Sequence, residues 1–135
     1  MADAMTDSKP LDTDEIKFVH RLEAAGHRVR WIPRDIIGGK PTNDFVWLTG
    51  GNIECELKST KARYGTIKGA VQRAVVGSGG VKDTFVVDIG VRHLTSKLRF
   101  QLAQYNTKVE TGAIRRLFVM SDDGASFEEI RLHEK

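Results

Sequence analysis

The residues best suited to chemistry lie on one expected strand, 53–58, where apolar and charged side chains alternate. Because successive side chains of a strand point to opposite faces of a sheet, Glu54, Glu56 and Lys58 share one face and the apolar residues share the other. Three charges on a central strand are costly to bury unless their face opens into a cleft or holds a cation. The alternative interpretation is a solvent-facing strand on which neighbouring Glu and Lys pair weakly.

A further carboxylate, Asp44, begins the preceding expected strand, 44–48. The segment Thr49-Gly50-Gly51-Asn52 between the two strands predicts a tight turn, since glycine supplies the positive φ that hairpin turns need. A hairpin brings the start of one strand beside the end of its partner. We therefore expect Asp44 to lie near Glu56 and Lys58.

Two carboxylates and a lysine at one strand end suit metal-dependent hydrolysis of a phosphodiester. Asp44 and Glu56 would bind Mg²⁺, or Mn²⁺ or Zn²⁺ in its place, through oxygen ligands, with Glu54 assisting. The cation would polarise the phosphate and lower the pKa of a bound water. Lys58 would orient that water or stabilise charge on the phosphate.

Asp44 followed by Glu56-Leu57-Lys58 resembles the D…(D/E)xK signature of the PD-(D/E)xK nuclease superfamily, although Asn43 stands where that superfamily usually has Pro before the Asp. The element order expected over residues 13–89 also matches. The resemblance implies an α/β fold of the restriction-endonuclease-like type, an αβββαβ core with a mixed central sheet flanked by helices. It also implies that an acid of the first helix, Glu15, completes the catalytic site. Taken alone, Glu15 can equally be a carboxylate that caps the helix.

Within that superfamily the chain looks most like the C-terminal nuclease toxin domains of CdiA contact-dependent growth inhibition proteins. The likeness rests on the segment AGHRVRWIP, the D…ExK pair, the Ser-Thr after Lys58 and the basic helix with a Gln. It implies a toxin that cleaves tRNA or DNA in the cytoplasm and can be delivered from another cell within a larger secreted protein. It also implies an acidic immunity protein as partner.

Basic side chains after the strand are candidates for gripping nucleic acid. Lys68 and Gln72 are i,i+4 neighbours on the expected helix 64–76 and could face the cleft or simply be solvated. Ser59 and Thr60 could bond a phosphate or cap the turn. More distant backbone contacts would come from the remaining bases, Lys61, Arg63 and Arg73.

The net charge of +3 over 135 residues conceals an uneven distribution. Residues 1–15 carry −4, residues 57–82 carry +6 with no acid, and residues 121–135 carry −3. A basic middle suits a polyanionic partner such as nucleic acid, but it also fits a solvated helix face. A non-catalytic nucleic-acid-binding module and a protein-interaction domain therefore remain the alternative classes of function.

The elements that must position these residues follow from hydrophobic periodicity. Helices are expected at 13–26, at 64–76 and around the Leu94, Leu98, Leu102, Tyr105 repeat, and strands at 29–32, 44–48, 53–58, 84–89, 117–120 and 126–132. We expect residues 1–11 to be a disordered, linker-like lead and residues 12–135 to form a single domain. No run of 18 apolar residues occurs, so no membrane span is expected.

Overall fold

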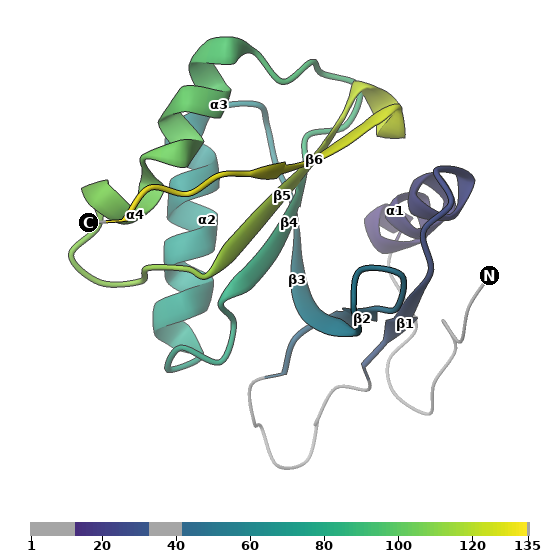
Figure 1. The fold of residues 1–135 in the computed structure, drawn as a ribbon, viewed down its shortest axis with the longest axis horizontal. Helices are drawn as coiled ribbons and strands as arrows, with labels where there is room; N and C mark the ends of the chain where they lie inside the picture. Colours follow the sequence, from purple (N-terminus) through teal and green to yellow (C-terminus); the bar gives the residue numbers. More distant parts are fainter. Residues whose placement is uncertain (1–12, 33–41, 135) are drawn as a thin grey trace.

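The computed structural model describes residues 13–32 and 42–134, which form an α/β fold around a six-stranded mixed sheet (Figure 1). The expected lead, residues 1–11, lies outside the described residues. The elements in chain order are α1 (Thr13–Ala24), β1 (Val29–Trp31), β2 (Phe45–Trp47), β3 (Ile53–Ser59), α2 (Tyr64–Gly77), β4 (Thr84–Asp88), α3 (Ser96–Ala103), α4 (Tyr105–Lys108), β5 (Arg116–Ser121), the 3-10 turn η1 (Asp122–Gly124) and β6 (Ser126–Ile130).

The strands lie in the sheet in the order in which they occur in the chain. β1, β2 and β3 form an antiparallel meander, β3, β4 and β5 are parallel, and β6 returns antiparallel to β5. The two parallel crossovers run through α2 and through α3 with α4, on one face of the sheet, while α1 covers the other face (Figure 1). The expected α/β class and mixed sheet are confirmed. No described helix is long and apolar enough to cross a bilayer.

Each face of the sheet has its own hydrophobic core, as the alternation of strand side chains requires. On the α1 face, Phe18, Val19 and Leu22 of the helix pack against strand residues that include Cys55 and Leu57. On the α2 face, the helical spacing of Ile67, Val71 and Val75 buries those side chains against β4 and β5. Strand β3 thus presents its apolar residues to α1 and its charged residues to the α2 side.

The third expected helix is divided in the structure. α3 begins at a Thr95 cap, whose hydroxyl accepts from the Leu98 N–H at 3.1 Å, and it ends at Gln104 before the short α4. The Tyr105 hydroxyl donates to the Gly112 carbonyl at 2.7 Å, and Asn106 forms two hydrogen bonds with the Ile114 backbone. These contacts to the segment after α4 are tertiary, so hydrophobic spacing within the helix could not predict the break.

The β2–β3 hairpin depends on a glycine that lies against a buried tryptophan. The Trp47 indole donates to the Thr49 hydroxyl at 3.1 Å and packs edge-on against Phe118, with ring centroids 4.9 Å apart. A methyl group added at Gly50 would overlap the Trp47 ring. At Gly51, φ is +98°, which favours glycine for a different reason.

We predict that Gly50→Ala lowers the free energy of unfolding by about 1–3 kcal/mol, because the buried Trp47 ring, which packs against Phe118, would have to shift. Urea denaturation measures this loss. Gly65→Ala is the control: a methyl group there meets no atom within 4 Å in the first turn of α2. That change should leave stability equal or raise it by up to about 1 kcal/mol. Equal effects of the two substitutions would contradict the prediction.

Candidate active site

The hairpin brings Asp44 alongside the charged part of β3, as its sequence predicts. Phe45 lies opposite Cys55 and Val46 opposite Glu54, so the next position outward places Asp44 at the level of Glu56. The Asp44 amide donates to the Cys55 carbonyl at 3.0 Å, and its Oδ2 accepts from the Leu57 N–H at 2.9 Å. The carboxylate is therefore held directly against the β3 backbone.

Glu56 is a buried carboxylate between two lysines. It is 3% exposed, and its Oε2 lies 2.9 Å from Lys82 Nζ and 3.4 Å from Lys58 Nζ. Its other oxygen, Oε1, is buried and has no hydrogen-bond partner among the described residues. Burying a carboxylate is costly unless it is paired, and the two ammonium groups supply that pairing on one side only.

The sequence did not identify Lys82 as part of this site. It follows α2, and its backbone N–H is fixed by the Ser78 hydroxyl at 3.1 Å. Asn43 also joins this region, since its side-chain amide lies 3.3 Å from Glu54 Oε1 and 3.5 Å from the Val81 carbonyl. The one hint in the sequence that Lys82 belongs to the site is its position at the end of the acid-free stretch 57–82. Because Lys82 lies far from Glu56 along the chain, the sequence could not predict their contact.

Glu54 and Glu15 differ in exposure and in the face of the sheet on which they lie. Glu54 is exposed on β3, on the same face as Glu56. Glu15 is 7% exposed, on the buried stripe of α1, which packs on the opposite face of the sheet. Within residues 13–32 and 42–134, no three His, Cys, Asp or Glu side chains gather as a metal-binding group.

Two carboxylates on adjacent strands nevertheless fit a hard divalent cation. Glu56 Oε1 is a buried oxygen without a partner in the described part of the chain, and Asp44 lies at the same level on the neighbouring strand. Mg²⁺ usually binds one or two carboxylates and completes its shell with waters and substrate phosphates. The donor set of Asp44 and Glu56 is therefore compatible with Mg²⁺ without a third protein ligand.

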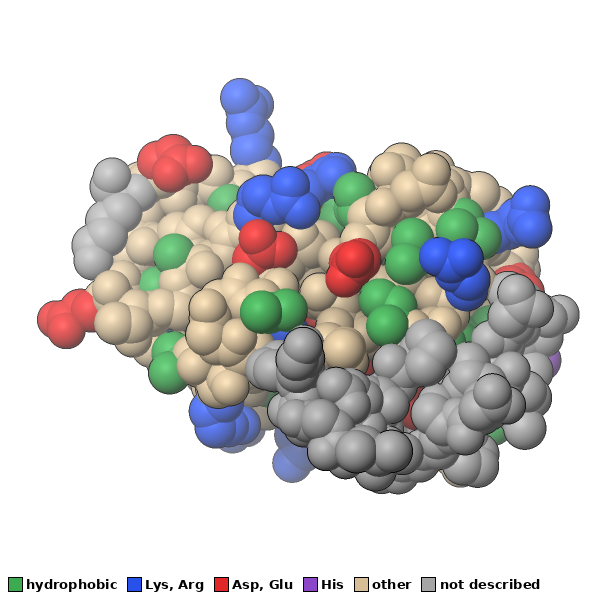
Figure 2. All heavy atoms as spheres, turned by 90° about the horizontal axis from the view of Figure 1, so that it is seen from below, with side chains coloured by type: hydrophobic (Ala, Val, Ile, Leu, Met, Phe, Trp, Pro, Cys, Tyr) green, Lys and Arg blue, Asp and Glu red, His purple; other side chains and the backbone are tan. Residues whose placement is uncertain are grey.

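The residues expected to contact nucleic acid divide among several surfaces. Lys61, Arg63 and Arg73 are exposed, and Lys68 is half-buried on α2. Gln72 donates its amide to the Thr111 carbonyl at 3.2 Å, so this nitrogen is occupied at the segment after α4. On the face seen in Figure 2, blue and red side chains are interspersed, and its described part has no continuous basic patch.

A pocket of about 790 Å³, lined mainly by charged and polar residues, includes the residues at the end of β3 and just after it. It lies on the α1 side at the carboxyl ends of β3 and β4, and we call it the α1 pocket. Ser59, Thr60 and Lys61 form part of its wall, as do Lys17, His20 and Arg21 of α1. The other lining residues are Asp14, Asp88, Ile89, Gly90, Val91, Arg92 and Asp123.

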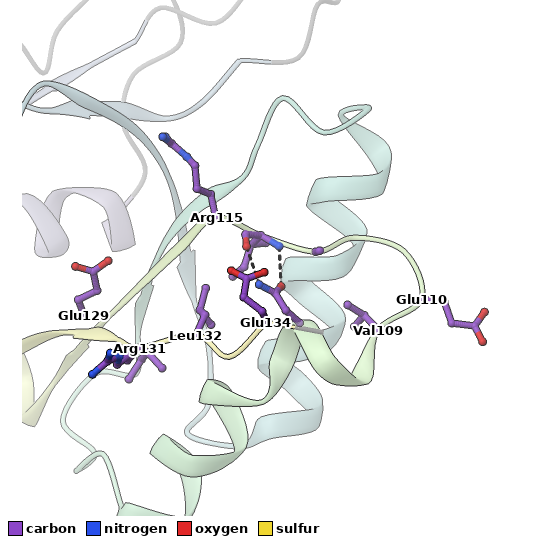
Figure 3. Close-up of a pocket in the computed structure, with 11 residues that line it drawn as sticks. Val109, Glu110, Arg115, Glu129, Arg131, Leu132 and Glu134 are labelled. Atoms are coloured by element: carbon purple, nitrogen blue, oxygen red, sulfur yellow. Dashed lines mark hydrogen bonds between the residues drawn. The ribbon is translucent and has the colours of Figure 1, made fainter.

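Another pocket, of about 580 Å³, lies between the segment after α4 and strand β6 (Figure 3). Its labelled residues include Arg115, Glu129 and Arg131, but none of the residues that the sequence suggested for chemistry lines it. Glu129 is already engaged with Arg116, with the two closest atoms 2.8 Å apart. We therefore do not place the active site there.

Several other polar or reactive residues contribute to the structure rather than to the candidate site. Burial raises the pKa of the Cys55 thiol to about 12, so this side chain is a packed thiol at neutral pH rather than a nucleophile. Asp88, a polar residue in an apolar strand, bonds Arg21 and accepts from the Gly90 N–H at 2.9 Å. Trp31 and Trp47 are buried in the core.

Comparisons of the chain with family models, with curated proteins and with solved structures give no match.

The coupling energy between Glu56 and Lys82 can be measured. We predict that a double-mutant cycle with Glu56→Gln and Lys82→Met gives a coupling energy of about 1–3 kcal/mol, since Lys82→Met leaves the buried Glu56 carboxylate with incomplete pairing. This range allows for the 21% exposure of the Lys82 side chain. Urea denaturation of the four proteins at pH 7 measures it.

The matched control is the exposed pair Arg99–Glu128, whose closest atoms are 2.9 Å apart. The corresponding cycle, with Arg99→Met and Glu128→Gln, should give only about 0.2–1 kcal/mol because water screens both charges. A coupling at Glu56–Lys82 no larger than that of this surface pair would show that the buried carboxylate does not depend on Lys82.

Proposed function

We propose that this chain is a metal-dependent endonuclease with a restriction-endonuclease-like core, in which Asp44, Glu56 and Lys58 are the catalytic residues. The observation that carries the proposal is their placement by one hairpin. Asp44 lies at the level of Glu56, and Lys58 Nζ lies 3.4 Å from Glu56 Oε2. The order of the elements from α1 to β4 supports the same core, since it matches the αβββαβ order that the resemblance to the superfamily implies.

The protein residues would divide the work of phosphodiester hydrolysis among them. Asp44 and Glu56 would hold the cation from two adjacent strands, with Glu54 beside them on the same face. The bound Mg²⁺, or Mn²⁺ or Zn²⁺, would polarise the scissile phosphate and lower the pKa of a coordinated water. Lys58 is 30% exposed, so its ammonium group can reach solvent and substrate as well as Glu56. It would orient the water and stabilise negative charge on the phosphate.

Lys82 would be a positioning residue in this scheme. Its ammonium is the nearer of the two to Glu56 Oε2, at 2.9 Å. Holding Oε2 leaves Oε1 as the oxygen available to a cation. Glu15 is not included, because α1 packs against the opposite face of the sheet from Glu56.

The likeness to CdiA nuclease toxin domains extends the proposal to a biological role. We propose a toxin domain that cleaves tRNA or DNA in the cytoplasm of the cell it enters, carried there within a larger secreted protein. Such an activity would harm the producing cell, so an acidic immunity protein would be the natural partner. Its acidic surface would complement the bases of residues 57–82.

The principal rival is a non-catalytic nucleic-acid-binding module. One observation favours it: both lysines approach the same oxygen of Glu56, as they would if that carboxylate served only to hold β3 and the segment after α2 together. Such a module would bind RNA or DNA without cutting either. Cleavage assays therefore separate the two functions.

The nuclease proposal predicts cleavage of tRNA or of plasmid DNA that requires Mg²⁺, Mn²⁺ or Zn²⁺ and stops in EDTA. Asp44→Asn, Glu56→Gln and Lys58→Met should each slow cleavage by about 10²–10³-fold, the usual cost of removing one group that stabilises transition-state charge. Asp44→Asn keeps an oxygen that can accept from the Leu57 N–H, so the hairpin should survive. Gel assays on total RNA, tRNA and plasmid DNA measure the rates.

Exposed charges elsewhere supply the controls for that experiment. Glu110→Gln and Lys108→Met remove one acid and one base from the segment at the end of α4 and should leave the rate unchanged. Circular dichroism melts check that every variant folds. Cleavage that persists in EDTA, or in the Asp44→Asn variant, would refute the proposed mechanism.

A further inference from the structure

The α1 pocket lies at an edge of the sheet where α/β proteins commonly bind ligands. The carboxyl ends of the parallel strands β3 and β4 form its base, with α1 and η1 at its sides. Crevices outside the carboxyl ends of parallel strands are frequent ligand sites. The residues that line the pocket come from four separate parts of the chain.

Most of the acidic side chains that line the pocket are already paired with a basic side chain. Arg21 bonds the buried Asp88 and also lies 3.5 Å from Asp123, so one guanidinium serves two of the three acidic side chains that line the pocket. The remaining acid is Asp14, which is exposed. Against it stand three exposed bases, Lys17, Lys61 and Arg92, none of which has an ion pair among the described residues. The rim therefore favours an anion.

Backbone hydrogen bonds hold the walls in place. The Thr60 N–H donates to the Asp88 carbonyl at 3.0 Å, which joins the ends of β3 and β4. The Asp123 N–H donates to the Gly90 carbonyl at 2.8 Å, which fixes η1 to the segment after β4. These backbone hydrogen bonds fix the positions of Lys61 and Arg92 relative to each other. Binding a ligand there therefore costs less conformational entropy than binding at a flexible loop.

The pocket is also close in sequence to the proposed catalytic lysine. Lys61 is three residues from Lys58, a span of about 10 Å even when extended. The Lys58 side chain lies on the α2 face, whereas the pocket opens on the α1 face. A strand passing the end of β3 could contact both.

We propose that the α1 pocket binds phosphate groups of the nucleic-acid strand away from the bond that is cut, through Lys17, Lys61 and Arg92. The identity of the ligand as a nucleic-acid strand rests on the proposed nuclease function. A nucleic-acid strand carries one negative phosphodiester group at each nucleotide, so it can place a charge beside each of these separated cations at once. A single small anion has only one charged group to offer them. The Ser59 hydroxyl on the same wall can donate a further hydrogen bond to a phosphate oxygen.

The test is binding without catalysis. Fluorescence anisotropy with a labelled single-stranded RNA and a DNA of the same sequence, in EDTA, measures the affinity and its dependence on salt. The triple variant Lys17→Ala, Lys61→Ala, Arg92→Ala should bind at least 10-fold more weakly at low salt. The slope of log K against log salt should fall in magnitude by about 2, since each phosphate contact to a single strand contributes about 0.7.

A charge-matched control separates the pocket from general electrostatic attraction. Lys97→Ala, Lys108→Ala, Arg131→Ala removes three exposed bases outside the pocket and should change the slope by less than 1. Equal losses in the two triple variants would overturn the proposal. So would inorganic phosphate competing at the concentration of the oligonucleotide's own phosphates, because the ligand would then be a free anion.

The result can be distinguished from that of the cleavage experiment. Binding in EDTA that depends on Lys17, Lys61 and Arg92 supports the pocket even if no cleavage is seen with any metal. Cleavage that requires Asp44 and Lys58, combined with wild-type binding by the pocket variant, supports the nuclease and rejects the pocket.

Discussion

The arrangement of this protein depends on a carboxylate that would be unstable in the interior by itself. Glu56 is 3% exposed in the middle of the sheet, and two ammonium groups lie within 3.4 Å of one of its oxygens. That pairing ties β3 to the segment after α2, because Lys82 reaches it from 26 residues further along the chain. The same pairing leaves Oε1 without a partner among the described residues, and this asymmetry supports a role beyond stability.

One face of β3 packs in the core, and the other carries the proposed catalytic residues. Cys55 and Leu57 complete the core beneath α1, so their alternation anchors the strand. Glu56 and Lys58 face the other way and are held at the edge of the α2 core. A strand that is anchored on one face can keep charged groups in fixed positions on the other, because its backbone cannot rotate without exposing apolar side chains. The proposed substrate contacts on the α1 side begin where this core ends, at Ser59.

The element order and the pairing of Asp44 with the ExK strand could be predicted from the sequence. Alternation along 53–58, the glycine turn and the placement of apolar residues in α2 are local patterns, and the structure confirms them. The break between α3 and α4 could not be predicted in this way, since it depends on Tyr105 and Asn106 bonding backbone groups up to eight residues later. The contact of Lys82 with Glu56 was missed for the same reason.

The sequence by itself determined which residues are available for chemistry and which strand carries them, because strand periodicity and turn chemistry act over a few residues. Only the tertiary structure decided which of those residues meet. It placed α1, which carries Glu15, on the face opposite Glu56, occupied the Gln72 amide with Thr111, and brought Lys17 and Arg92 to the pocket that Lys61 lines. The physical reason is that crossovers and packing, rather than spacing along the chain, set the distances between charged groups.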